Sequence, residues 1–160
     1  MGAGKSTVGR RLAKRLKLKF FDSDQEIEHR TGATVSLIFE IEGEAGFRKR
    51  EKDIIDALTK QSGIVLATGG GAVLDPDNRQ SLANRGVVIY LKSGLTPLVR
   101  RTSRDSKRPL LKADDPAARL RELLVIRGPI YEDIADMVID TDQRTPQSIV
   151  DEIAGSKILQ

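Results

Sequence analysis

The sequence predicts an α/β fold built on a parallel sheet, and three observations support that prediction. Short apolar runs alternate with stretches of helical periodicity along the chain. The run at 87–91 is continuously apolar, which is typical of a parallel strand covered on both faces. A glycine-rich segment at 2–7 has the form of a loop that feeds a helix. At 160 residues, the chain is long enough for one domain with a sizeable buried core.

The N-terminal segment matches the second half of the phosphate-binding pattern G-x-x-x-x-G-K-[ST], through Gly2, Ala3, Gly4, Lys5, Ser6 and Thr7. Glycines let backbone N–H groups surround phosphate oxygens, the lysine neutralises their charge, and the serine hydroxyl can bind Mg²⁺. A flexible turn of small residues is the alternative interpretation. The helix that follows favours the phosphate loop, because Val8, Leu12 and Leu16 recur at four-residue spacing. The first glycine of the pattern would lie two residues before Met1, so we expect a cut loop without the strand that feeds it.

The other elements follow from the same alternation of patterns. We expect strands at 18–21, 64–67, 87–91 and 137–139. We expect further helices near 24–31, 45–61, 76–85, 94–103, 116–127 and 146–155. Four prolines fall near the first turns of such helices, where a missing N–H is harmless: Pro76, Pro97, Pro116 and Pro146. The segment 103–115 is polar and highly charged, which indicates a mobile loop.

Composition excludes several classes of protein. The chain has no cysteine and therefore neither disulfides nor thiolate metal sites, which fits a reducing compartment. Its 27 Lys and Arg against 23 Asp and Glu leave a net charge of +4, which suits small anionic ligands. Four Phe, two Tyr and no Trp are too few for a base-stacking surface, so we expect no nucleic-acid partner. Because no apolar run reaches 18 residues, we also expect no membrane span.

Polar clusters follow two of the expected strands, at the carboxyl ends where parallel sheets bind ligands. Asp22-Ser23-Asp24 follows the first of these strands, and two interpretations of it are compatible. Ser23 or Asp24 caps the next helix, while Asp22 reaches a metal and Asp24 faces a substrate hydroxyl. Thr68-Gly69-Gly70-Gly71 follows the second strand. Its glycines allow close approach of the backbone to a ligand, and a flexible turn is the alternative.

Three arginines are candidates for binding anions. Arg48 and Glu51 share a helix face, so they form either a surface ion pair of little value or a pair in which Glu51 orients Arg48 towards a ligand. Arg127 lies in an apolar helical stripe with Leu124, where an arginine needs a partner such as a substrate carboxylate. Arg108 lies in the charged segment and can reach a phosphate when a lid closes.

Six motifs in the same order resemble the shikimate kinase family, and together they cover nearly the whole chain. They are Gly-Ala-Gly-Lys-Ser-Thr at 2–7, Phe-Asp-Ser-Asp at 21–24, Gly-x-x-x-Phe-Arg-x-x-Glu at 43–51, Gly-Gly-Gly at 69–71, Arg-Pro-Leu-Leu at 108–111 and Arg-x-Pro-x-Tyr at 127–131. Many nucleotide-binding proteins share the first motif. The second, third and fourth motifs form a set that is specific to this family.

The resemblance implies ATP-dependent phosphorylation of the 3-hydroxyl of shikimate, a step of chorismate and aromatic amino acid biosynthesis. It implies a three-layer P-loop NTPase fold of the nucleoside-monophosphate-kinase type, with a parallel sheet of strand order 2-3-1-4-5. It further implies a single kinase domain over 1–160, with a substrate-binding segment at 23–51 and a lid at 104–116. The chain begins after the central first strand of the family, so we expect its stability and activity to suffer.

The resemblance also implies a role for each matching residue. The implied catalytic residues are Lys5, Asp24 and Arg108. The implied ATP site contains Gly2, Ala3, Gly4, Lys5, Ser6, Thr7, Arg101, Arg108 and Pro146, of which Arg101 and Pro146 flank adenine. The implied shikimate site contains Asp24, Arg48, Gly69, Gly70, Gly71 and Arg127. The implied Mg²⁺ ligands are Ser6 and Asp22.

Two other functions stay open at this stage. Another P-loop kinase, for gluconate or a nucleoside monophosphate, would share the phosphate loop and the lid. A nucleotide switch or a nucleic-acid-associated ATPase would need an Asn-Lys-x-Asp segment or a base-stacking surface, and the sequence has neither. We therefore expect a cytoplasmic, monomeric kinase that uses Mg²⁺ and binds ATP and shikimate.

Overall fold

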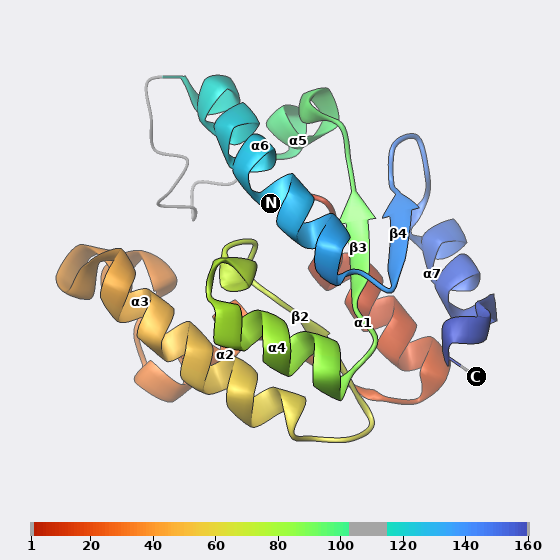
Figure 1. The fold of residues 1–160 in the computed structure, drawn as a ribbon, viewed down its shortest axis with the longest axis horizontal. Coiled ribbons are helices and arrows are strands. Elements are labelled where there is room, and N and C mark those ends of the chain that lie inside the picture. The colour runs from red at the N-terminus through yellow and green to blue at the C-terminus, as the bar shows by residue number, and fades with distance from the viewer. Residues whose placement is uncertain (1, 103–114, 160) are drawn as a thin grey trace.

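The fold is that of an α/β protein, as the sequence predicts, and the computed structural model describes residues 2–102 and 115–159 (Figure 1). The strands are β1 (Lys19–Asp22), β2 (Ile64–Ala67), β3 (Ile89–Lys92) and β4 (Met137–Asp140). The α-helices are α1 (Lys5–Leu16), α2 (Ser23–Thr31), α3 (Val35–Thr59), α4 (Pro76–Arg85), α5 (Leu95–Thr102), α6 (Pro116–Ile134) and α7 (Pro146–Gly155). Two 3-10 turns are η1 (Ala72–Leu74) and η3 (Lys157–Leu159). Arg108 and nearly all of the expected lid at 104–116 lie outside the described residues.

Side-chain caps fix where most helices begin. The N-cap residues whose side chains accept backbone N–H groups of the first turn are Asp22, Thr34, Asp75, Asp115 and Thr145. Prolines start α4, α6 and α7, as expected for a residue that lacks an N–H. Each cap satisfies N–H groups that have no partner within the helix.

Two helices extend beyond the bounds that the sequence patterns predict. The span α3 joins two helical stretches across a kink at Gly43, whose backbone angles are non-helical (φ 70°, ψ −176°), and the helix expected at 45–61 corresponds to the second stretch. Because the kink interrupts the helical periodicity, the sequence pattern does not predict the first half of α3. The helix expected at 116–127 continues to Ile134 and contains Pro129. A proline removes one backbone hydrogen bond, but tertiary packing keeps the helix together.

The strands form two parallel pairs, β1 with β2 and β3 with β4. Asp22 lies opposite Ala67 in the first pair, and Lys92 lies opposite Asp140 in the second. In the expected order 2-3-1-4-5, β1 and β2 correspond to the second and third strands, and β3 and β4 correspond to the fourth and fifth. The two pairs therefore agree with the positions on either side of strand 1 in that order. In each pair the carboxyl ends coincide, so the loops that follow them lie together.

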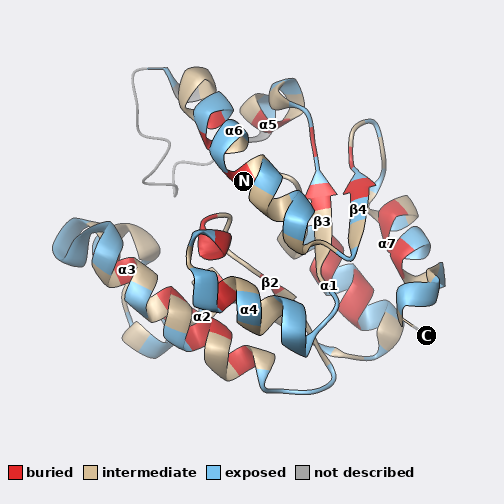
Figure 2. Cartoon of the chain, viewed as in Figure 1, coloured by how far each residue is buried: buried red, intermediate tan, exposed pale blue. Residues whose placement is uncertain are grey.

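Each strand pair has its own hydrophobic core. Val8 and Leu12 of α1 pack with β3, β4 and α7 through Leu91, Ile139 and Ile153. Figure 2 shows this core as buried residues along α1, α7 and the second strand pair. The other core joins α2 and α3 through Ile27, Ile38, Phe47, Ile54 and Leu58, with side chains of β1 and β2 packed against it.

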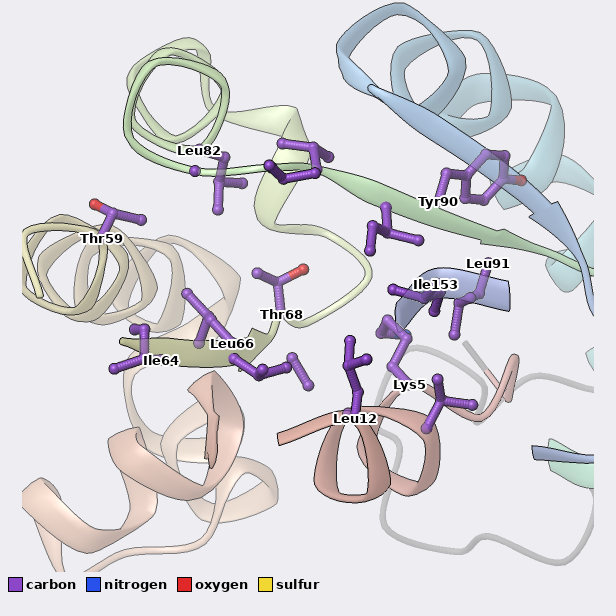
Figure 3. A pocket seen from close by; sticks show the side chains of 18 of the residues that line it. Lys5, Leu12, Thr59, Ile64, Leu66, Thr68, Leu82, Tyr90, Leu91 and Ile153 are labelled. Atoms are coloured by element: carbon purple, nitrogen blue, oxygen red, sulfur yellow. The ribbon is translucent and has the colours of Figure 1, made fainter. Parts of the chain in front are cut away.

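A cavity of about 610 Å³ lies between the two strand pairs (Figure 3). Its mostly apolar lining includes Leu66 of β2, Leu91 of β3, Leu12 of α1 and Ile153 of α7. Within the described residues, no strand pairs with the second edge of β2 or of β3. The backbone groups of these edges therefore lack ladder partners, and the apolar lining lacks side chains to pack against.

Filling this cavity with a strand should stabilise the fold. We expect an N-terminal extension of about ten residues, an apolar run followed by Gly-x, to add ladder bonds and bury several apolar side chains at about 1.5–3 kcal/mol each. The melting temperature should rise by about 10 °C or more. Thermal melts of the 160-residue chain and the extended chain would measure the difference. An extension of equal length made of Gly and Ser is the control, and equal melting of all three proteins would contradict the expectation.

Candidate active site

The phosphate loop leads directly into α1. Gly2 (φ 70°) and Gly4 (φ 89°) adopt left-handed backbone angles, which glycine reaches without strain. Gly4 is the N-cap of α1 and has no side-chain cap, and Lys5 is the first helical residue. The open N-terminus of α1 therefore presents backbone N–H groups and the positive end of the helix dipole, the arrangement that binds phosphate.

Asp22 connects the phosphate loop to the end of β1. Ser6 Oγ donates a 2.6 Å hydrogen bond to Asp22 Oδ2, so the two expected Mg²⁺ ligands lie together. The other carboxylate oxygen, Oδ1, accepts the N–H of Asp24 at 3.1 Å and that of Gln25 at 3.5 Å. The expectation that Ser23 or Asp24 caps α2 is therefore wrong: Asp22 is the N-cap, because its short carboxylate at the strand end reaches both N–H groups.

A hydroxyl and a carboxylate are oxygen donors that suit Mg²⁺, which in proteins is usually held by one or two carboxylates, water and substrate phosphates. Within the described ranges, no three acidic, histidine or cysteine side chains gather to form a metal site. Ser6 and Asp22 thus fit a metal that takes its remaining ligands from the nucleotide and from water.

Ser23 joins the loops that follow β1 and β2. It is fully buried, and its Oγ accepts a 2.9 Å hydrogen bond from the Gly69 N–H. The sequence does not predict this role, because the pattern of residues does not show which loop lies beside Ser23. The bond fixes the start of the triple-glycine loop (Gly69, Gly70 and Gly71) against the start of α2.

Arg48 and Glu51 form a close ion pair on α3. Arg48 Nη1 lies 2.5 Å from Glu51 Oε2, and a second bond of 3.0 Å runs from Arg48 Nη2 to Glu44 Oε1. The Glu51 side chain is fully buried, so the interpretation as a surface pair is wrong. Burial raises the pKa of Glu51, while the charge of Arg48 opposes that rise. Glu51 Oε1 has no hydrogen-bond partner among the described residues.

The triple-glycine loop is pressed against acidic and basic side chains. A Cβ built on Gly69 would lie 2.6 Å from Glu51 Oε1 and 3.0 Å from Asp24 Oδ1. A Cβ on Gly71 would overlap the guanidinium of Arg48. Neither glycine has a left-handed backbone, so a side chain at either position would meet these neighbouring groups and not backbone strain. This close packing favours a site in which the loop backbone approaches polar side chains.

Arg127 of α6 also lies near Glu51. It is 4% exposed, and its Nε has no hydrogen-bond partner among the described residues. Its charge acts on the carboxylate of Glu51. One turn further along α6, the Tyr131 hydroxyl donates a hydrogen bond to the Gly70 carbonyl. This role of Tyr131 is not among the sequence-based expectations, although its position four residues after Arg127 indicates the same helix face.

The structure thus brings most of the expected residues into two clusters. Ser6 and Asp22 lie at the phosphate loop, and Asp24, Arg48, Gly69, Gly71 and Arg127 gather around Glu51. Pro146 begins α7 and follows the N-cap Thr145. Arg108 and the side chain of Arg101 are not among the described parts, so their expected roles stay predictions.

Comparisons with known proteins point to one family. A family model described as shikimate kinase matches residues 1–156. A shikimate kinase from Legionella pneumophila (strain Corby) is 55% identical over 153 residues, which are 96% of this chain and 87% of the relative. One from Methylococcus capsulatus is 56% identical over 156 residues, or 98% of this chain and 87% of the relative.

Solved structures give the same result. The shikimate kinase from Acinetobacter baumannii in complex with shikimate has a TM-score of 0.94 and 48% identity, and the match covers 96% of this chain and 86% of that one. The enzyme from Bacteroides thetaiotaomicron has a TM-score of 0.86 and 30% identity, with coverage of 96% and 91%.

The raised pKa of Glu51 predicts a pH dependence of stability. Because the folded state holds the Glu51 proton more tightly than the unfolded chain does, stability should fall as the pH rises from about 4.3 through the raised pKa. Glu51→Gln has no proton to lose there. Over that interval, the melting temperature of the parent should therefore fall relative to that of Glu51→Gln.

Thermal melts at half-unit steps from pH 4 to pH 8 would measure this difference. The control is Glu122→Gln, at an exposed residue paired with Arg119 on the surface. Parallel melting curves for the parent and Glu51→Gln across the whole range would show that Glu51 has an ordinary pKa.

Proposed function

Because the chain belongs to the shikimate kinase family, which phosphorylates shikimate with ATP, we propose that it acts on the 3-hydroxyl through the two clusters described above. Phosphoryl transfer asks a protein mainly to position both substrates and to neutralise developing charge. One cluster would hold the phosphates and the other would hold the acceptor.

One observation carries this proposal: buried polar atoms of opposite kind lie around the triple-glycine loop with no partner among the described residues. Glu51 Oε1 is an acceptor and Arg127 Nε is a donor. A buried polar atom without a partner is costly, so a ligand that supplies both kinds of group relieves both. A small acid with several hydroxyls, such as shikimate, supplies them.

At the acceptor end, Arg48 and Arg127 would bind the shikimate carboxylate, because the planar guanidinium forms paired bonds with a carboxylate. Gly69, Gly70 and Gly71 would let the substrate approach the backbone. The Asp24 carboxylate lies beside Gly69. It would orient the attacking hydroxyl and accept its proton as the phosphoryl group is transferred.

At the phosphate end, the backbone of Gly2, Ala3, Gly4 and Thr7 would surround phosphate oxygens, and Lys5 would neutralise their charge. Ser6 and Asp22 would hold Mg²⁺, which supplies positive charge to the transferring phosphoryl group when bound. The support for this metal is the pair of oxygen ligands that lie 2.6 Å apart.

The remaining assignments rest on the family resemblance. Segment 23–51 would bind the acceptor, and the segment 104–116 would close over both substrates and exclude water, with Arg108 on the transferring phosphate. Arg101 and Pro146 would flank adenine.

We infer a single kinase domain over 1–160 that works as a monomer in the cytoplasm, where its co-substrate ATP is found. We infer no nucleic-acid partner, because the chain lacks the aromatic side chains of a base-stacking surface. Among the described helices, none combines the length and the apolar character needed to cross a membrane.

Substrate choice tests the proposed function. ADP formation should depend on shikimate, and an analogue that lacks the carboxylate should be a poor substrate. Arg127→Ala should raise the KM for shikimate by about 10- to 100-fold, the range for a lost bond to a charged group, and leave the KM for ATP nearly unchanged. Arg121→Ala, at an exposed position of the same helix, is the control. Equal turnover of gluconate or a nucleoside monophosphate would overturn the assignment.

Asp22→Asn tests the metal site. Asparagine is as good an N-cap as aspartate, so the variant should melt within a few degrees of the parent. It lacks the charge that would bind Mg²⁺, so we expect the Mg²⁺ concentration for half-maximal activity to rise by about 10- to 100-fold. Asp75→Asn is the matched control, because Asp75 caps α4 in the same way through Asp77 and Asn78. An unchanged Mg²⁺ titration would leave Asp22 with a capping role alone.

A further inference from the structure

Tyr131 contacts the triple-glycine loop from α6. It lies on α6, four residues after Arg127 and therefore on the same helix face. Its hydroxyl donates a hydrogen bond to the carbonyl of Gly70, the middle glycine. The two residues are 61 positions apart in the chain, so this bond joins elements that the local sequence does not connect.

Two side chains thus hold the loop. The Gly69 N–H donates to Ser23 Oγ at 2.9 Å, and the Gly70 carbonyl accepts from Tyr131. The carbonyls of Gly69 and Gly71 accept backbone N–H groups of Ala72 and Leu74, so the Gly70 carbonyl is the one that depends on a side chain. Three consecutive glycines have much backbone freedom, so each of these bonds restricts the conformations of the loop.

Fixing the Gly70 carbonyl also fixes the next N–H. The peptide bond between Gly70 and Gly71 is trans, as no cis bond occurs in the described chain, so the Gly71 N–H points away from the Gly70 carbonyl. Gly71 is the residue that packs against the guanidinium of Arg48. The bond from Tyr131 to Gly70 thereby acts on the orientation of the backbone beside Arg48, although Tyr131 lies far from Arg48 in sequence.

The tyrosine ring is itself held in place. It packs on Tyr90 of β3 with the ring centroids 5.0 Å apart and the planes tilted by 34°. Burial raises the pKa of Tyr131, although the charge of Arg127 partly opposes the rise. The phenol thus stays protonated at neutral pH and keeps donating its hydrogen bond.

We propose that Tyr131 is a positioning residue for shikimate binding: its hydroxyl holds the triple-glycine loop in the conformation that faces Arg48 and Arg127. The inference rests on the proposed function in one respect, the role of these two arginines as the carboxylate site. The Tyr131 hydroxyl contacts both the loop and Arg127, and it takes no part in phosphoryl transfer.

Tyr131→Phe tests the proposal, because it keeps the ring on Tyr90 and removes only the hydroxyl. We expect the KM for shikimate to rise about tenfold, equivalent to about 1.4 kcal/mol, while the kcat, the KM for ATP and the melting temperature change little. A side chain that merely stabilised the fold would lower the melting temperature and would not single out one substrate. Tyr90→Phe is the matched control, since it removes a hydroxyl from the same ring pair but not from the loop.

Amide hydrogen exchange of the peptide 68–74, measured without substrate, supplies a readout independent of activity. The exchange should be about tenfold faster in Tyr131→Phe than in the parent or in Tyr90→Phe. Equal exchange in all three proteins would overturn the tether. An unchanged KM for shikimate in an active Tyr131→Phe variant would overturn its role in binding. A parent that forms ADP with gluconate or a nucleoside monophosphate but not with shikimate would instead overturn the proposed function, and hydrogen exchange would still decide whether Tyr131 holds the loop.

Discussion

The cluster of side chains around the triple-glycine loop depends on the ion pair between Arg48 and Glu51. Glu51 is fully buried, and it lies where Arg48, Asp24, Arg127 and the triple-glycine loop meet. A buried carboxylate is tolerated only with compensating positive charge, and Arg48 at 2.5 Å supplies it. The same contact fixes the guanidinium of Arg48, so one interaction both stabilises the interior and orients a group that can bind an anion.

Much of the fold could be predicted because its signals are local. The alternation of apolar runs and helical periodicity located the four described strands to within two residues at each end. Features that depend on distant contacts were not accessible in this way. Gly43 interrupts the backbone of α3, so the residues before it did not read as the same helix, and α6 continues past Pro129 because packing outweighs one lost hydrogen bond.

In the candidate site, too, local patterns could be predicted and contacts between distant segments could not. The motifs predict that Ser6 and Asp22 bind the same metal, and the structure confirms that the two side chains are in contact. The cap of α2 was assigned to the wrong residue, because one carboxylate serves both Ser6 and the helix, and spacing alone does not reveal such double use. The bonds from Ser23 to Gly69 and from Tyr131 to Gly70 join segments 46 and 61 residues apart, and no pattern within a single segment encodes them.

The packing of the triple-glycine loop has a consequence for which substitutions can arise together. Gly71 has right-handed backbone angles (φ −93°, ψ −5°) that alanine can also adopt. The atoms nearest to an added methyl group are those of the Arg48 guanidinium, the far end of a flexible side chain that would have to move. Alanine at position 71 would therefore shift the guanidinium that bonds Glu51 and Glu44. A short side chain at position 48 would remove that conflict, so we expect the residues at positions 48 and 71 to vary together.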